Sequence, residues 1–284
     1  MTKIGIIGKG FVGNAVQNGF STLKDCQIKI YDKNPLRSQN SLKEVVSDSD
    51  YLFISLPTPS NIDGSINLDT IYECLEQINE IKDSKAIILL RSTMIPGSTK
   101  LLQDKYPELK IVFNPEFLTE KNANEDFINQ SRIILGGEKI FTERVAELYK
   151  KRFGTEKKII ETTFETAELI KYMNNCYLAT KVSFMNEMKL ISENCNADWG
   201  KAVYGFSQDE RVGKSHMSVP GHDGKLGFGG SCLPKDVQAL ISFAEQNNIS
   251  LNTLSGAWKT NLELRPEKDW NKLVGRAIVK KKII

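Results

Sequence analysis

Histidine is scarce in this chain, which has only two in 284 residues, His216 and His222. Hydrolytic triads and most zinc sites draw on histidine, so neither kind of site has enough material here. The five cysteines are odd in number and scattered, and they form no Cys-x-x-Cys pair, which argues against disulfide bonds and zinc. We therefore expect reduced thiols, no metal site, and acid-base chemistry from lysine, aspartate, glutamate or threonine.

Long apolar runs and strong charge are also missing. No apolar run approaches a membrane span, and glycine breaks the first ten residues too early for a signal peptide. The net charge is +3, and the one dense basic run, Lys280–Lys282, is typical of a solvated tail. We expect a cytoplasmic protein that binds neither membranes nor nucleic acid. Its 40% apolar and 26% charged composition suits two globular domains.

The first motif with chemical meaning is the turn Gly8–Gly13, of sequence GKGFVG. It follows a short apolar run and precedes a helical pattern, which is the order of strand, turn and helix in a dinucleotide site. A second apolar run ends in Asp32, nineteen residues after Gly13. A carboxylate at this spacing accepts hydrogen bonds from the adenosine ribose, so the pattern favours NAD over NADP. Arg37 tempers that preference, because an arginine there can receive a 2′-phosphate.

Apolar runs of strand length alternate with helical patterns as far as residue 161, which indicates an α/β fold with a doubly wound, Rossmann-type parallel sheet. Short groups that contain polar residues follow three of these runs, at Pro57-Thr58-Pro59, Arg91-Ser92-Thr93 and Asn114-Pro115-Glu116. The carboxyl ends of parallel strands meet at one edge of a sheet, and ligands bind there. Each group is also explained by an ordinary turn, but three at one edge favour a site.

A long helical pattern over residues 162–194 begins what we predict to be an all-helical central domain. A capping box of Thr162 and Glu165 is expected to start this helix. Lys171 and Asn175 lie four residues apart, so they share a helix face. The predicted domains are residues 1–161 for dinucleotide binding, 162–260 for the central domain, and 261–284 for a helical tail.

The most distinctive stretch is GFGGSCLPKD, residues 227–236. Its glycines allow close approach of the backbone to a ligand, and Leu233-Pro234 is typical of a helix start, which places Cys232 at a helix amino terminus. The helix dipole and Lys235 both favour the thiolate, the form of cysteine that attacks carbon. We predict a nucleophile at Cys232, although a lone cysteine is more often a small buried apolar residue.

Seven motifs together resemble the nucleotide-sugar 6-dehydrogenases of the UDP-glucose/GDP-mannose dehydrogenase family, most closely those that act on UDP-glucose. The motifs are GKGFVG, PTPS, RSTMIPGST, NPEFLTE, ELIKYMNN, DERVG and GFGGSCLPKD, and the resemblance runs from residue 3 to about residue 284. Members of this family oxidise a primary alcohol twice, with two NAD, through a cysteine-linked thiohemiacetal and thioester. The resemblance implies the same reaction here, on UDP-glucose, GDP-mannose or a UDP-hexosamine.

The resemblance also implies roles for individual residues. Cys232 is the nucleophile, Lys171 and Asn175 stabilise oxyanions, and Asp236 holds the proton network, while Thr93, Glu116 and Glu120 position substrate or water. The implied NAD contacts are Gly8, Gly10, Phe11, Val12, Gly13, Asp32, Arg37, Pro57, Thr58, Ser92, Thr93 and Glu120. The implied substrate contacts are Glu116, Phe117, Leu118, Lys171, Asn175, Arg211, Phe228, Gly229 and Cys232. Arg211 would reach the substrate across a homodimer interface on the helix at 163–194.

Members of the family usually carry a third domain, which binds the uridine nucleotide and supplies a lysine and an arginine. The sequence reaches Ile284 where the first strand of that domain would begin, so we expect weak nucleotide recognition. A two-domain β-hydroxyacid dehydrogenase is an alternative, since that class also pairs a lysine with an asparagine one turn later, but it needs no cysteine. A further alternative is a catalytically weak NAD-binding partner of a full-length enzyme.

Overall fold

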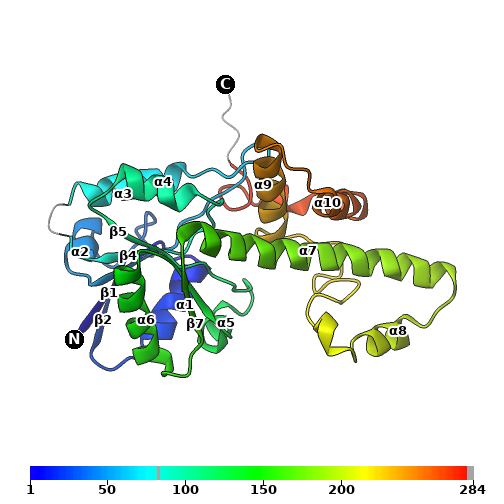
Figure 1. Cartoon of the computed structure of the whole chain (residues 1–284), viewed down its shortest axis with the longest axis horizontal. Helices are drawn as coiled ribbons and strands as arrows, with labels where there is room; N and C mark the ends of the chain where they lie inside the picture. Colours follow the sequence, from blue (N-terminus) through cyan, green and yellow to red (C-terminus); the bar gives the residue numbers. More distant parts are fainter. Residues whose placement is uncertain (82–83, 280–284) are drawn as a thin grey trace. The chain divides into compact units, whose positions relative to one another are not determined.

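The computed structural model describes residues 1–81 and 84–279, which form two compact units (Figure 1). The first unit comprises Met1–Thr58 and Leu68–Lys171, and the second comprises Pro59–Asn67 and Tyr172–Ile284. The basic run Lys280–Lys282 lies outside the described residues. No helix in the described part of the chain is both long and apolar enough to cross a membrane.

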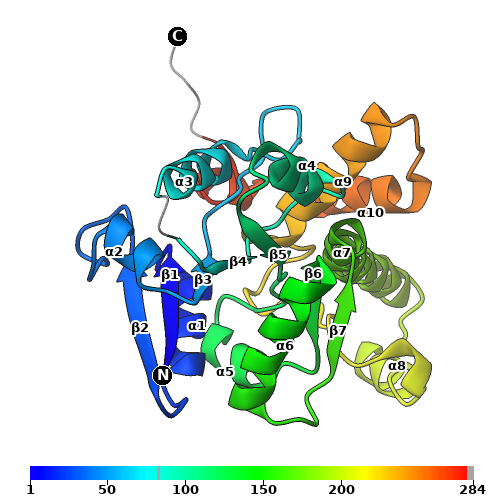
Figure 2. The same ribbon diagram turned by 60° about the vertical axis from the view of Figure 1, so that its left-hand side comes forward.

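A seven-stranded sheet forms the middle of the first unit, in the order β2-β1-β3-β4-β5-β6-β7 (Figure 2). Neighbouring strands are parallel, with Ile4 of β1 opposite Ile28 of β2 and Tyr51 of β3, except that β5 and β6 are antiparallel. The strands are β1 (Thr2–Ile7), β2 (Cys26–Tyr31), β3 (Tyr51–Ile54), β4 (Ile87–Leu90), β5 (Lys110–Phe113), β6 (Ile133–Gly137) and β7 (Ile159–Thr162). The predicted Rossmann-type sheet is confirmed, with one reversed pair that a pattern of apolar residues does not encode.

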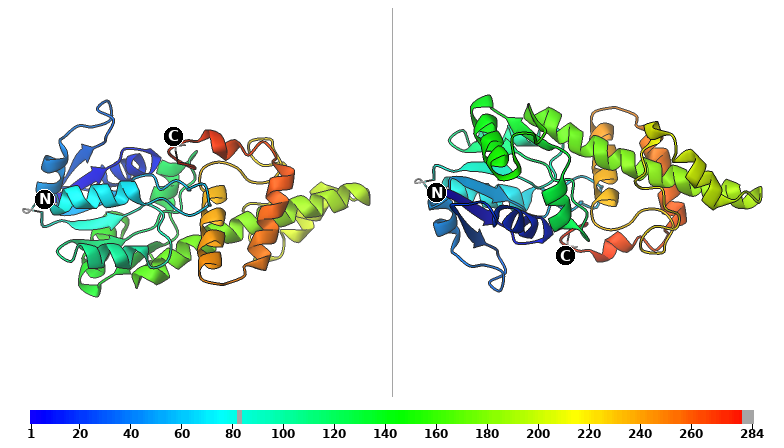
Figure 3. Two further views of the ribbon diagram at one scale, coloured as in Figure 1. Left: turned by 90° about the horizontal axis from the view of Figure 1, so that it is seen from above. Right: turned by 90° about the horizontal axis from the view of Figure 1, so that it is seen from below.

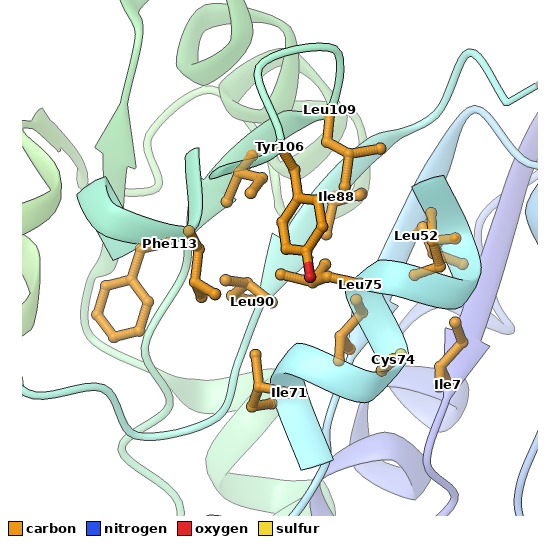
Figure 4. Close-up of a cluster of buried hydrophobic side chains, with 14 of the residues drawn as sticks. Ile7, Leu52, Ile71, Cys74, Leu75, Ile88, Leu90, Tyr106, Leu109 and Phe113 are labelled. Carbon is orange, nitrogen blue, oxygen red and sulfur yellow. The ribbon is translucent and has the colours of Figure 1, made fainter. Parts of the chain in front are cut away.

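Helices cover both faces of this sheet because its strands are apolar on both sides. Ile88 and Leu90 of β4 belong to the apolar cluster drawn in Figure 4, together with Leu75 of α3. Ile87 and Leu89, which alternate with them, belong to a second cluster that includes α1, α5 and α6. The helices of this unit are α1 (Phe11–Phe20), α2 (Leu42–Ser47), α3 (Asp69–Asn79), α4 (Ser98–Lys105), α5 (Ala123–Asn129) and α6 (Lys139–Phe153). This double covering is what a buried parallel sheet requires.

The second unit is built from helices, as predicted. The helix α7 (Phe164–Asn194) contributes its residues up to Lys171 to the first unit and the rest to the second. In the second unit, α9 and α10 both cross α7 (Figure 3), and Ser183 of α7 donates a hydrogen bond to the Ala257 carbonyl of α10 at 2.7 Å. The other helices are α8 (Trp199–Phe206), the 3-10 helix η1 (Glu210–Val212), α9 (Leu233–Gln246), α10 (Asn252–Leu264) and the 3-10 helix η2 (Asp269–Lys272).

The start of α7 differs from the sequence-based prediction. Thr163, not Thr162, caps the helix, because its Oγ1 accepts a hydrogen bond from the backbone N–H of Thr166 at 3.3 Å. The predicted capping box of Thr162 and Glu165 is therefore wrong by one residue. Adjacent threonines give the same local signal, and Thr162 is instead the last residue of β7.

Candidate active site

The glycine turn after β1 has the geometry of a dinucleotide site. A Cβ on Gly8, whose φ is +89°, would lie 2.5 Å from the Ser55 carbonyl oxygen, and a Cβ on Gly13 would lie 2.0 Å from the Gly8 carbonyl oxygen. These two glycines allow close packing of strand and helix. A Cβ on Gly10 would meet nothing within 4 Å, and no side chain caps α1 at this residue. The amino terminus of α1 is therefore open to an anionic group such as a pyrophosphate.

Asp32 lies beside this turn, at the end of β2. Its Oδ2 accepts a hydrogen bond from the backbone N–H of Lys9 at 2.6 Å, and its Oδ1 accepts one from Asn34 at 2.8 Å. The turn follows β1, which lies between β2 and β3, so it sits at the point where the order of strands changes direction and ligands bind. Arg37 is exposed on the loop after β2. These residues fit the adenosine end and the pyrophosphate of NAD.

Replacing Asp32 with alanine should weaken NAD binding by about tenfold or more, because a charged acceptor for the ribose hydroxyls is lost. Discrimination against NADP should fall as well. Calorimetry with both nucleotides measures the two effects. Asp50→Ala is the matched control, since Asp50 is exposed and accepts a hydrogen bond from the Lys3 N–H. Unchanged affinity for both nucleotides in Asp32→Ala would remove Asp32 from the ribose site.

The ends of β3 and β4 are tied together by Ser92. Its Oγ donates to the Leu56 carbonyl at 2.7 Å and accepts from the Leu56 N–H at 3.1 Å. Next to these residues, Thr58 is buried, Pro57 is exposed and Thr93 is half-buried. The strand ends therefore hold a defined loop at the edge where the sequence predicts ligand contacts.

Asn114 departs from the expectation that polar residues at the strand ends face a ligand. Its Oδ1 accepts hydrogen bonds from Arg91 Nη1 at 2.7 Å and from the Tyr149 hydroxyl at 2.5 Å. Arg91 also lies over the ring of Phe127, 5.4 Å from its centroid. Because this network is buried in the core, Asn114 and Arg91 serve the packing of α5 and α6 against the sheet.

Lys171 and Glu116 form a buried ion pair. Lys171 Nζ lies 2.9 Å from Glu116 Oε1 and also donates to the Glu116 backbone carbonyl, and the side chains are only 3% and 7% exposed. Glu116 Oε2 accepts a hydrogen bond from the Leu118 N–H at 2.7 Å, and the Phe117 ring lies 5.4 Å from Lys171 Nζ. The structure thus brings together four predicted residues. A buried ion pair needs such additional contacts, and here they hold the ammonium in place.

Glu120 and Phe11 meet at a pocket between α1 and α5. The pocket has a volume of about 240 Å³ and is lined by Phe11, Asn14 and Glu120–Glu125. Phe11 and Val12 also pack against the core, whereas Glu120 is exposed. The pocket lies beside the amino terminus of α1, so the structure places Glu120 near the predicted pyrophosphate site.

Cys232 is the N-cap residue of α9, with Pro234 in the first turn, as predicted. The cysteine is half-buried, and its Sγ lies 3.7 Å from the Ser231 hydroxyl. The amino-terminal location is as expected for thiolate support. The Lys235 ammonium forms a buried ion pair with Asp236, at 2.5 Å from Nζ to Oδ1. Asn175 of α7 donates to the other oxygen, Oδ2, at 2.6 Å. The structure therefore places Asn175, Asp236 and Lys235 in one buried group on the helix that begins at Cys232.

Two further predicted substrate contacts and Arg211 lie elsewhere in the second unit. Phe228 is buried, and Gly229 is half-buried against Arg265. Arg211 in η1 is 89% exposed, and its guanidinium is paired with Asp209. Among residues 1–81 and 84–279, no three acidic, histidine or cysteine side chains are grouped to hold a metal ion.

Glu168 is a buried acid that the sequence reading missed. Its Oε2 accepts a hydrogen bond from the Gly97 N–H at 2.6 Å, and its Oε1 accepts from the Thr99 N–H at 2.8 Å and hydroxyl at 2.6 Å. Burial outweighs these donors and raises the pKa of the carboxyl to about 7. Glu168 thereby fixes the loop that carries Thr93 to the helix that carries Lys171. The available signal was its place in the motif ELIKYMNN, three residues before Lys171.

The pKa of Glu168 predicts a pH-dependent stability. The folded carboxyl keeps its proton up to about pH 7, whereas in the unfolded chain it titrates near pH 4.5. The stability that this difference contributes is fully present below pH 4.5, and it is lost as the pH rises through 7. Relative to Glu168→Gln, which does not titrate, the wild-type free energy of unfolding should fall by about 3 kcal/mol from pH 4 to pH 8. Urea unfolding followed by circular dichroism measures this. Glu76→Gln, an exposed change on α3, is the control, and parallel pH profiles of wild type and Glu168→Gln would contradict the assignment.

Comparison with known proteins agrees with this arrangement. Residues 21–154 match the NAD-binding domain of the UDP-glucose/GDP-mannose dehydrogenase family, and residues 165–263 match its central domain. The chain belongs to this family. The family resemblance predicted from the motifs is confirmed, and so is NAD as the cofactor of the amino-terminal domain.

Individual members of the family are similar over most of the chain. The UDP-glucose 6-dehydrogenase of Rickettsia bellii is 33% identical over 233 residues, which are 80% of this chain and 52% of that protein. The chain thus spans about half the length of this curated relative. The solved UDP-glucose dehydrogenase of Pyrobaculum islandicum has a TM-score of 0.81 at 27% identity, covering 94% of this chain and 69% of that one.

A β-hydroxyacid dehydrogenase shares the fold as well. The 3-hydroxyisobutyrate dehydrogenase of Mycobacterium tuberculosis aligns with a TM-score of 0.75, covering 94% of this chain and 95% of that one. Its sequence identity is 15%, so the likeness concerns the fold alone.

Proposed function

We propose that this chain oxidises the primary alcohol of a nucleotide sugar to the carboxylic acid, with two NAD, through a covalent intermediate on Cys232. One observation carries the proposal. Cys232 begins the helix whose next turn presents Asp236, fully buried and bonded to both Asn175 and Lys235. Because Asp236 binds one amide and one ammonium group, its carboxylate has a fixed place in the fold. Chemistry on the adjacent Cys232 thiolate requires a group held in this way.

In the first oxidation the alcohol loses a proton and a hydride and becomes an aldehyde. NAD bound at the glycine turn supplies the hydride acceptor. Lys171, whose position Glu116 fixes, stabilises the developing alkoxide by its charge. Thr93 and Glu120 position the substrate and water.

In the second oxidation the Cys232 thiolate forms a bond to the aldehyde carbon, which gives a thiohemiacetal. Lys171 and the Asn175 amide stabilise the resulting oxyanion. Loss of a second hydride leaves a thioester, and water then breaks the carbon–sulfur bond, releasing the acid and the thiol. Asp236 keeps Asn175 oriented and holds the proton network at the water. Each NAD accepts one hydride and thus two electrons, and the proton of the alcohol and the proton of the Cys232 thiol pass to solvent water.

The proposed substrate is UDP-glucose, because similar proteins of Rickettsia bellii and Bacillus subtilis are named for it. The test is the yield of NADH per sugar over UDP-glucose, GDP-mannose, UDP-hexosamines and 3-hydroxy acids. Two NADH per nucleotide sugar supports the proposal. One NADH per 3-hydroxy acid would favour the alternative of a β-hydroxyacid dehydrogenase. NAD binding without turnover of any of these compounds would favour a catalytically weak NAD-binding partner. The assay covers substrate concentrations up to the millimolar range.

We also propose a homodimer through α7. Met173, Tyr177, Phe184 and Ile191 recur at helical spacing on this helix, and all four are exposed although apolar. Arg211, also exposed, would then serve the substrate of the partner subunit. Sedimentation equilibrium of wild type and Tyr177→Glu tests this, with a monomeric wild type as the contradicting result. The cytoplasmic location stays a prediction.

A further inference from the structure

The loop that leads to Cys232 has no secondary structure of its own. No residue from 213 to 232 lies in a helix or a strand. Backbone groups in such a segment need partners outside the regular hydrogen-bond ladders, or they are left unsatisfied when buried. Gly227 and Phe228 are buried nonetheless. The side chains that satisfy them therefore determine where the loop lies.

Asn261 of α10 binds both polar groups of one residue of this loop. Its Oδ1 accepts a hydrogen bond from the Phe228 N–H at 2.6 Å, and its Nδ2 donates to the Phe228 carbonyl at 3.0 Å. Asn261 is fully buried. An amide carries one acceptor and one donor group on a short, neutral side chain, so it can replace the strand partner that Phe228 lacks.

Neighbouring groups of the loop are held in the same way. The Gly227 N–H donates to Asn186 Oδ1 of α7 at 3.2 Å, and the Leu226 carbonyl accepts from Arg265 Nη1 at 3.3 Å. Arg265 is itself buried and fixed by Asp269, at 2.8 Å from Nε to Oδ1. The Phe228 ring packs on Trp258, with 6.0 Å between ring centroids.

We propose that Asn261 is a positioning residue for the nucleophile: its two hydrogen bonds to Phe228 fix the loop and thereby the location of the Cys232 thiol, four residues further on. Asn186 and Arg265 support the same anchor. The glycines fit this role, since a Cβ on Gly227 would lie 2.4 Å from Asn261 Oδ1 and one on Gly229 would lie 2.6 Å from the Arg265 guanidinium. Side chains at these two residues would push the loop off its anchor.

The test measures turnover and thiol accessibility in the same variants of residues 1–284. In Asn261→Ala, kcat should fall by roughly 10- to 100-fold, because the reacting sulfur is no longer held in place. The rate of Cys232 alkylation by iodoacetamide, without substrate, should rise by about fivefold or more, because the half-buried thiol opens to solvent more often. Peptide mapping assigns the alkylation to Cys232. NAD binding should be unchanged.

The opposite directions of the two effects separate positioning from thiol chemistry. If alkylation and turnover fall together, Asn261 acts on the ionisation of the thiol, and the positioning role is overturned. Unchanged alkylation and kcat in folded Asn261→Ala would overturn it too. If that variant does not fold, Asn186→Ala removes the single hydrogen bond to Gly227 and should show smaller effects in the same directions. Wild-type kcat and alkylation rate in Asn186→Ala would then contradict the anchoring of the loop. Asn252→Ala, an exposed change on α10, is the control.

The expected loss of turnover rests on the proposed function, but the alkylation rate does not. If Cys232→Ser retains two NADH per sugar, the thioester mechanism fails. Faster alkylation of Asn261→Ala would still establish the anchor in that case.

Discussion

Cys232→Ser should abolish formation of the acid. A serine hydroxyl stays protonated near neutral pH, and it is a far poorer nucleophile than a thiolate at a helix amino terminus. We expect a loss on the order of 10³-fold or more in acid formation, since removal of a nucleophile typically costs this much. The first oxidation does not need the sulfur, so at most one NADH per sugar should appear. The measurement is NADH yield together with chromatography of the sugar product.

Cys195→Ser is the matched control for this change. Cys195 is an exposed thiol at the far end of α7, whereas the buried Cys176 has a raised pKa, caused by burial and then by the Asp236 carboxylate. The control variant should retain wild-type stoichiometry. Two NADH per sugar from Cys232→Ser would rule out the thioester.

Breaking the pair of Lys235 and Asp236 should cost the second unit about 3 to 5 kcal/mol of unfolding free energy. Both groups are buried, with Asp236 0% and Lys235 7% exposed, so removing one partner leaves an uncompensated charge away from water. Lys235→Met and Asp236→Asn should each show this loss, and the double variant should lose much less than the sum of the two. Urea unfolding followed by tryptophan fluorescence suits the measurement, because Trp199, Trp258 and Trp270 all lie in this unit.

An exposed ion pair supplies the control. Lys201 of α8 and Asp198, in the same unit, are 88% and 56% exposed, so Lys201→Met should change the unfolding free energy by less than about 1 kcal/mol. A similarly small effect of Lys235→Met would mean that Asp236 is not held as the structure indicates, and its proposed role would fail with it.

Patterns of several residues were predictable from the sequence, and isolated long-range contacts were not. The turn Gly8–Gly13 and the apolar strands follow from local spacing, and so does the helix start after Cys232. The antiparallel pairing of β6 is invisible because apolar alternation is the same in both directions. Asn261 is a single polar residue in a helix, and only the fold brings it to Phe228.

The partners of single polar residues were harder to predict than the motifs that contain those residues. Lys235 follows Cys232 closely in sequence, and in the structure its ammonium forms an ion pair with Asp236. Asn114 ends a strand at the ligand edge, yet it belongs to a buried network with Arg91. In both cases burial decides the partner, and burial depends on tertiary packing.

The covalent intermediate is tested most directly by intact-protein mass spectrometry of Glu120→Gln. Glu120 is exposed and lines the pocket beside α1, so its amide should leave the fold intact while slowing the steps that use water. After incubation with UDP-glucose and NAD, the variant should carry the added mass of the nucleotide sugar, and peptide mapping should place that mass on Cys232. Continued production of two NADH per sugar, with no adduct on Cys232 at any time, would contradict the mechanism.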